Sequence, residues 1–231
     1  CSIGYEMMYV AMDSAMPTMA MNEEAGSVDF SETNVQVAGV DEGDIIKTDG
    51  EFIYTISGNT LFVIKAFPGD ESEIVSTMNF DKGSPQGMFI EDEQLIIFGR
   101  VSNYELFDDL ELPSRSSMTF FEVYDMSDKE ELSLTKEFVF EGNYFESRMI
   151  GDYIYIVTQQ YPQNRPRPMP FFVEDGLVRE TSVNSIKYFP IPYDSISFVT
   201  INAIDLKDLD YESETLAVEG SREMYMSHNN M

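Results

Sequence analysis

Residues 31–57 read SETNVQVAGVDEGDIIKTDGEFIYTIS, and this stretch decides the fold. Three valines at alternating or near-alternating positions lead into an acidic turn at residues 41–44. A Lys-Thr-Asp-Gly turn follows at 47–50, and an alternating apolar run occupies 52–56. Apolar residues at every second position, interrupted by Asp-Gly, are typical of strands joined by hairpins. The stretch therefore predicts β-structure.

The same pattern returns further along the chain. An acidic or glycine turn followed by an apolar strand occurs at 49–54, 91–96 and 150–155, and a second apolar strand follows in each unit. Four strands over roughly 40 to 50 residues, once insertions are removed, is the signature of a propeller blade. The sequence therefore predicts an all-β protein, a β-propeller built from four-stranded antiparallel blades.

The repeat also divides the chain. We expect a partial propeller over residues 31–231, with blades at about 47–90, 91–149 and 150–222 and the start of a further blade at 223–231. A four-stranded sheet with two apolar faces must stack on neighbouring sheets, and propellers close with four to eight of them. About three blades cannot close such a ring, so we interpret the chain as an incomplete propeller.

With the repeat in view, a family resemblance is visible. The stretch TNVQVAGVDEGDIIKTDGEFIYTIS resembles the hallmark of a family of secreted archaeal and bacterial β-propeller proteins that are distantly related to WD repeats. Later matches, in the same order, are FFEVYDMSD (120–128), GNYFESRMIGDYIYIVT (142–158), VTINAIDL (199–206) and MYMSHNNM (224–231). The resemblance implies export and a propeller architecture, and it implies no particular reaction. At Gly43 the family usually has a small residue such as Ala, a difference that we expect to be harmless.

The resemblance also implies structural roles for residues of these motifs. The residues concerned are Asn34, Asp41, Asp44, Lys47, Asp49, Gly50 and Arg148. In so acidic a chain, we expect Arg148 to pair with carboxylates between blades.

The charge of the chain limits its partners. Its 231 residues hold 42 acidic and 14 basic side chains, which gives a net charge of −28. Binding to phosphate backbones needs clustered Lys and Arg, so no nucleic-acid partner is expected. No run of 18 apolar residues is present, so we expect no transmembrane segment. The sequence gives no information on oligomeric state.

The first 30 residues differ in composition from the rest. This leader is rich in Met, with Met8, Met12, Met16 and Met19 at helical spacing. Thioethers are soft ligands that suit Cu(I), which raises the hypothesis of a metal-handling surface protein; a flexible tether is the alternative. Cys1 is the one cysteine, and lipid anchoring through Cys1 or a fragment boundary at this position both stay open.

Four carboxylates in the opening motif suggest a cation site. Asp41, Glu42, Asp44 and Asp49 lie within nine residues, and Ca²⁺ takes six to eight oxygen ligands. Their spacing does not fit the alternating calcium loop, and short acids at turns commonly accept backbone N–H bonds instead. Calcium is thus one interpretation of this group and turn capping the other.

The insertion at 161–194 is the candidate for a specific function. It is rich in Pro, Arg and aromatic residues, and long loops on rigid scaffolds often carry recognition. The residues that we expect to contact a partner are Arg165, Arg167, Phe171, Phe172, Tyr188 and Tyr193. Alternatively, the loop packs over the blade rim as a stiff cover.

No catalytic motif is present in the sequence, so we expect a non-enzymatic binding or structural module of an exported or cell-surface propeller, with a protein or polysaccharide partner. One alternative is a carboxylate-dependent hydrolase that acts on surface polysaccharide, which would need an acid pair of raised pKa in the central channel. The other alternative is metal handling by the Met-rich leader.

Overall fold

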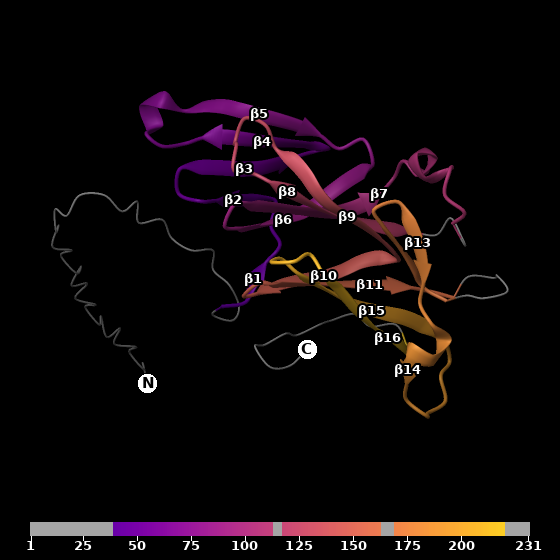
Figure 1. Ribbon diagram of the computed structural model, residues 1–231. Helices are drawn as coiled ribbons and strands as arrows, with labels where there is room; N and C mark the ends of the chain where they lie inside the picture. The colour runs from indigo at the N-terminus through magenta and orange to yellow at the C-terminus, as the bar shows by residue number, and fades with distance from the viewer. Residues whose placement is uncertain (1–38, 113–116, 163–168, 220–231) are drawn as a thin grey trace, which may run out of the picture.

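The computed structural model describes residues 39–112, 117–162 and 169–219. These residues form sixteen strands and three short 3-10 helices, and none of them lies in an α-helix. The strands make three sheets that follow one another in chain order, stacked from top to bottom in Figure 1. We name them blade A, blade B and blade C.

Blade A is a four-stranded antiparallel sheet. It contains β2 (Ile46–Thr48), β3 (Phe52–Ser57), β4 (Thr60–Lys65) and β5 (Glu73–Asn79), paired in that order. The 3-10 helix η1 (Gly69–Glu71) lies between β4 and β5. Ser57-Gly58-Asn59-Thr60 makes the tight β3–β4 hairpin, where Gly58 has a φ of +60°.

Blade B has four antiparallel strands and an added hairpin. The four are β6 (Gly83–Glu91), β7 (Gln94–Val101), β8 (Met118–Asp125) and β9 (Ser133–Glu141). The helix η2 (Tyr104–Phe107) follows β7. The hairpin of β12 (Phe171–Glu174) and β13 (Leu177–Glu180) extends the sheet beyond β9, although it comes from the sequence of blade C.

Blade C is arranged in the same way. Its four antiparallel strands are β10 (Asn143–Ile150), β11 (Tyr153–Gln160), β15 (Ser197–Asp205) and β16 (Tyr211–Val218). The short strand β1 (Asp41–Glu42) pairs with β10 at one edge, and β14 (Lys187–Tyr188) pairs in parallel with β16 at the other. The helix η3 (Val183–Ser185) precedes β14.

The all-β architecture of four-stranded antiparallel blades is confirmed, but the sheets divide the chain about one strand earlier than the expected boundaries. The chain passes from blade A to blade B at residues 80–82, and from blade B to blade C at Gly142. The turns after Glu91 and Ile150 are hairpins inside blades B and C. Sequence reasoning took these acidic turns as the starts of blades, because an internal hairpin and a connection between blades use the same turn residues.

The core lies between the blades, as the stacking argument requires. One cluster of buried side chains joins blades A and B, with Tyr54, Val63 and Phe120 among its members. A second cluster joins blades B and C, and Phe121 and Ile156 belong to it. Full burial of each large apolar side chain contributes about 1.5–3 kcal/mol, so stacking of the blades is a main source of stability.

Residues 41–48 pair with the first strands of blades C and B and then form the first strand of blade A. Asp41 and Glu42 pair with β10 of blade C. Asp44 and Met88 exchange two backbone hydrogen bonds on β6 of blade B, at 3.3 and 2.8 Å. The chain then becomes β2, the first strand of blade A. We call residues 41–48 the crossing segment; it links the same edge of the three sheets (Figure 1).

Candidate functional site

The crossing segment is held by a buried lysine. The Nζ of Lys47 donates to both carboxylate oxygens of Asp41 and to the carbonyl oxygen of Glu42, each at 2.8 Å. Lys47 is 8% exposed, and its Nζ lies 5.7 Å from the centroid of the Phe89 ring. All three donors of the ammonium are therefore used, and a buried charge satisfied in this way fixes the fold of the segment.

The other carboxylates of the motif serve turns. Asp44 Oδ1 accepts the Ile45 N–H at 2.6 Å. Asp49 accepts the N–H groups of Glu51 and Phe52, at 3.1 and 2.8 Å, and the hydroxyl of Tyr54 at 2.8 Å. Burial of Tyr54, followed by this bond and the charge of Asp49, raises the tyrosine pKa. Gly50, next in the turn, has a φ of +96°.

Arg148 connects the crossing segment to blade C. Its Nη1 donates to Glu146 Oε1 on the same strand at 2.7 Å, and its Nη2 lies 3.3 Å from Glu42 Oε1. Because Glu42 comes from the segment that leads into blade A, this arginine ties distant parts of the chain together. Arg148 thus pairs with carboxylates, but both partners lie in the sheet of blade C and not on a neighbouring blade, because β1 pairs with β10.

The four motif carboxylates do not converge. Asp41, Glu42 and Asp49 each face a different cation, namely Lys47, Arg148 and Lys129. In the part of the chain that the structure describes, no three acids, histidines or cysteines stand close enough to hold a metal ion. Calcium binding at these residues stays a prediction; the contacts observed are ion pairs for Asp41 and Glu42 and turn capping for Asp44 and Asp49. Asn34 and the Met-rich leader lie outside the described residues.

Gly43 lies where the crossing segment passes closest to the core. A Cβ atom at this position would stand 2.5 Å from Cζ of Phe98 and 3.0 Å from Oγ of Ser147. Phe98 is 1% exposed and packs on Phe89 and Tyr144, with ring centroids 5.7 and 5.0 Å away. The ring therefore has little freedom to move, and in this chain the glycine is not interchangeable with alanine.

The first half of the insertion belongs to the scaffold. Phe171 is 2% exposed and packs in the cluster between blades A and B. The ring of Phe172 packs at a tilt of 49° against Tyr211 of blade C, with ring centroids 4.5 Å apart. The prediction that Phe171 contacts a partner is wrong, because β12 pairs with β9 and buries this side chain in the blade interface. For Phe172, which is only partly buried, partner contact stays a prediction. Arg165 and Arg167 lie outside the described residues.

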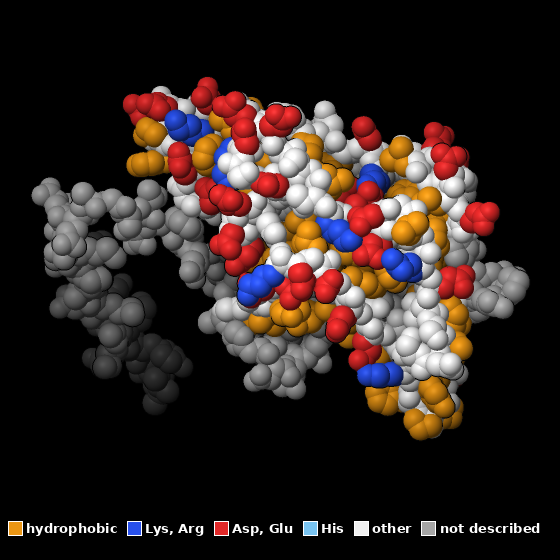
Figure 2. Space-filling model, in the orientation of Figure 1, with side chains coloured by type: hydrophobic (Ala, Val, Ile, Leu, Met, Phe, Trp, Pro, Cys, Tyr) orange, Lys and Arg blue, Asp and Glu red, His pale blue; other side chains and the backbone are white. Residues whose placement is uncertain are grey.

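The second half of the insertion forms an exposed apolar surface. Residues 186–193 run along the edge of blade C, and we call them the tip. Tyr188 is 70% exposed, Phe189 57% and Ile191 59%. Figure 2 shows apolar side chains gathered over the region of β14, while acidic side chains dominate much of the remaining face. Adjacent apolar side chains at such exposure are unusual on a free surface and mark contact sites.

Hydrogen bonds order the tip from within. The hydroxyl of Tyr193 donates to the Phe189 carbonyl at 2.8 Å and accepts the Phe189 N–H at 3.0 Å. The Ile191 N–H donates to the same carbonyl at 2.8 Å. Lys187 pairs with Glu214 of β16 at 2.7 Å. Tyr188 thus lies on the surface as expected. The two hydrogen bonds of the Tyr193 hydroxyl close the loop, and we call them the latch.

Sequence reasoning missed a buried ionic cluster between blades A and B. Lys82 pairs with Glu122 at 2.6 Å and also with Glu137, and the Tyr124 hydroxyl donates to Glu122 at 2.7 Å. Burial lowers the lysine pKa, but the two glutamates outweigh it and raise the pKa overall. Burial, then Glu122, raises the Tyr124 pKa. The signal available was Glu122 inside an otherwise apolar strand, where a charge needs a partner.

Glu91 bears on the hydrolase alternative. It ends β6, the first strand of blade B, and burial followed by the charges of Asp92, Asp152 and Asp41 raises its pKa. Asp152 and Asp41 are themselves paired with Lys207 and Lys47. Glu91 is thus an acid of raised pKa at the end of the first strand of blade B. Two of the carboxylates near it, Asp41 and Asp152, are already paired with lysines.

Comparison with known proteins identifies the domain. A sequence profile described as "Beta propeller domain" matches residues 30–231. An uncharacterized protein of Archaeoglobus fulgidus is 27% identical over 225 residues, which cover 95% of this chain and 33% of that protein. An uncharacterized protein of Methanocaldococcus jannaschii is 27% identical over 207 residues, which cover 87% of this chain and 28% of that protein.

The chain therefore spans a third or less of the length of the curated relatives that it matches. Among the described residues, no helix has the length and apolar character needed to cross a membrane. Together, the three stacked sheets, each built on four antiparallel strands, and the profile match over residues 30–231 show that the chain belongs to the β-propeller domain family.

Proposed function

We propose that the chain is a non-enzymatic protein-binding module of an exported, cell-surface β-propeller protein, and that the tip is its contact surface. One observation carries this proposal. Three neighbouring apolar side chains, Tyr188, Phe189 and Ile191, stand more than half exposed on a loop whose backbone is closed by its own hydrogen bonds. An ordered loop loses little entropy on binding, and aromatic side chains are favoured as binding hot spots.

The charge of the chain indicates the chemistry of the partner. Acidic residues adjoin the tip: Asp194 follows it directly, and the Asp194 N–H donates to Glu219 at 3.0 Å. The whole chain carries −28. Opposite charges around an apolar contact speed association and exclude wrong partners. The surface that fits is an apolar pocket with a basic rim on another protein. Export is supported by the resemblance of residues 33–57 to secreted propellers, and Cys1 is the residue that would carry a lipid anchor.

Photo-crosslinking tests the tip directly. The photoreactive residue benzoylphenylalanine replaces Tyr188 in the full-length protein in its own cells, and Leu134, half exposed on β9 of blade B, is the matched control position. We expect a discrete protein adduct from position 188 and none from position 134. Adding Phe189→Ser and Ile191→Ser removes two apolar contacts worth about 2 kcal/mol or more each, so the adduct should disappear.

Three results would count against the proposal. They are equal adducts from both positions, an adduct that survives the double serine change, and an adduct whose added mass is a glycan. Tyr193→Phe, which removes the latch and leaves the exposed side chains in place, should lower the adduct yield without abolishing it, because the loop must then be ordered on binding.

The hydrolase alternative has one observation in its favour, the raised pKa of Glu91. A glycosidase needs a protonated acid and a second, free carboxylate across a cleft. Two of its three acidic neighbours, Asp41 and Asp152, are held by lysines, and the third, Asp92, is the next residue along the same turn, which favours the binding module over the hydrolase.

A further inference from the structure

A hollow opens at one end of the seam between blades A and B. Its volume is about 460 Å³, within the range of small-ligand sites. One wall comes from the ends of β3, β4 and β5 of blade A, and the other is the turn between β8 and β9 of blade B. Phe52 and Val75 line it and also pack against the apolar cluster between the two blades. The hollow therefore has an apolar base.

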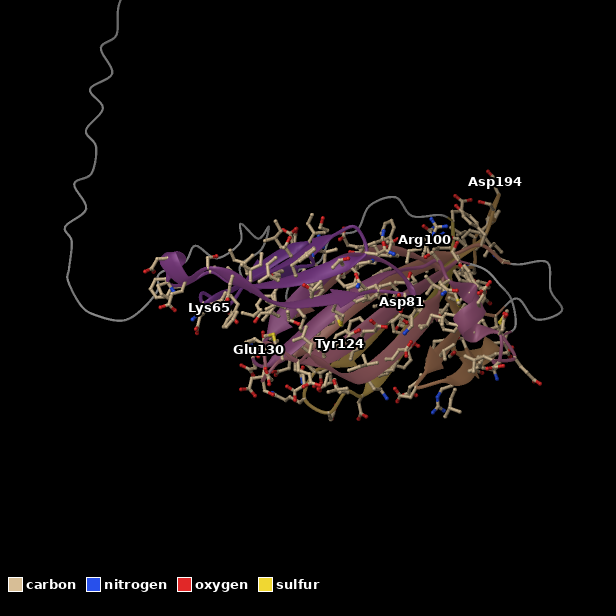
Figure 3. The ribbon with its side chains drawn as sticks, turned by 90° about the horizontal axis from the view of Figure 1, so that it is seen from above. Lys65, Asp81, Arg100, Tyr124, Glu130 and Asp194 are labelled. Carbon is tan, nitrogen blue, oxygen red and sulfur yellow. The ribbon has the colours of Figure 1, made fainter. Side chains whose placement is uncertain are left out.

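Its rim is acidic. Glu51, Glu73, Asp128 and Glu130 line the hollow, and among the described residues none of the four makes an ion pair. The two lysines in the lining are already engaged by acids outside it. Lys65 pairs with Glu71 at 3.2 Å, and Lys129 lies 3.7 Å from Asp49. Figure 3 shows Lys65 and Glu130 near one another at the same end of the molecule.

The interface between blades A and B already holds one ammonium group, that of Lys129, against an aromatic ring and a carboxylate. We expect an incoming ammonium group to be held in a similar way. Lys129 Nζ lies 5.8 Å from the centroid of the Tyr54 ring, while its charge faces Asp49. An aromatic face together with a carboxylate is a favoured site for an alkylammonium group. The lining thus combines an apolar base with four carboxylates that make no ion pair in the described part of the chain, and the buried ring of Tyr54 holds the ammonium group of Lys129 beside it.

We propose that this hollow binds a short basic segment of a protein, with a lysine side chain beside an aromatic residue. The aromatic group covers Phe52 and Val75, and the ammonium group lies between Glu73 of blade A and Glu130 of blade B. The site is separate from the tip, which belongs to blade C, so either can fail without the other.

Titration with the peptide Ac-Phe-Lys-NH2, followed by NMR on the whole chain, tests the site. We expect shifts confined to the residues that line the hollow, at positions 51, 52, 65, 73, 75 and 127–130, and a dissociation constant on the order of 1 mM at low salt. Raising NaCl from about 20 to about 300 mM should weaken binding roughly tenfold, because the rim charges are exposed and screened. Ac-Ala-Lys-NH2, which has the same charge without the aromatic ring, should bind at least roughly tenfold more weakly.

Two matched double variants complete the test. Glu73→Gln with Glu130→Gln should weaken peptide binding about tenfold, whereas Glu180→Gln with Glu212→Gln, which removes equal charge elsewhere, should leave it unchanged within about twofold. Equal losses in the two variants, shifts spread over the whole surface, Ac-Ala-Lys-NH2 that binds as well as Ac-Phe-Lys-NH2, or no binding would each overturn the proposal.

Discussion

Replacing Lys82 with methionine is expected to lower the free energy of unfolding by about 3–5 kcal/mol. The substitution leaves Glu122, whose side chain is 6% exposed, and Glu137 side by side between blades A and B without their shared cation. A buried carboxylate that loses its partner carries the full cost of its removal from water. Urea denaturation followed by circular dichroism measures the change.

Lys65→Met is the control for this variant. Lys65 pairs at 3.2 Å with Glu71, whose side chain is 63% exposed, so its loss should cost about 0–1 kcal/mol. Equal destabilisation by the two substitutions would mean that the Lys82 cluster is no more than a surface pair. The raised pKa of Lys82 gives the pH window. Its stabilising contribution is complete below the ordinary lysine pKa of 10.5 and is lost only as the pH rises above that value.

Gly43→Ala is expected to destabilise the protein by about 1–3 kcal/mol, although it adds a single methyl group. The new Cβ would stand 2.5 Å from Cζ and 2.8 Å from Cε1 of Phe98. The buried ring can make room only by disturbing Phe89 or Tyr144. Gly69→Ala is the matched control, since no heavy atom lies within 4 Å of its added Cβ, and it should change stability by less than about 0.5 kcal/mol.

A double-mutant cycle assigns the cause of that loss. Phe98→Leu removes the ring atoms that meet the new Cβ, so Gly43→Ala should cost at least about 1 kcal/mol less in that background than in the wild type. An equal cost in both backgrounds would show that the clash with Phe98 is not the reason. The family usually has a small residue such as Ala at this position, and in this chain the ring of Phe98 lies where the alanine Cβ would stand.

The architecture was predictable because it rests on local signals. The alternation at 52–56 and the Asp-Gly turns are properties of neighbouring residues, and they specify strands and hairpins directly. The blade boundaries were not predictable to better than one strand. The turn after Glu91 and the connection at 80–82 are both short and polar, and only the pairing of whole strands distinguishes them.

Side-chain roles were predictable only where the partner is close in sequence. Asp49 caps its own turn, a contact that residue type and spacing suggest. Phe171 and Phe172 have the same composition signal as Tyr188, yet β12 crosses to blade B and buries one of them while β14 stays at the surface. The Lys82 cluster joins residues 40 and 55 positions apart, which no local pattern reveals.

Amide hydrogen exchange of the tip tests the central claim most directly, which is that the blades hold an apolar loop in one ordered conformation at the surface. The N–H groups of Phe189, Ile191 and Asp194 each have an acceptor, at 3.0, 2.8 and 3.0 Å. They should therefore exchange at least about tenfold more slowly than in an unstructured peptide. Exchange of all three at the rate of an unstructured peptide would contradict the account, because the apolar side chains would then belong to a loop without a fixed surface.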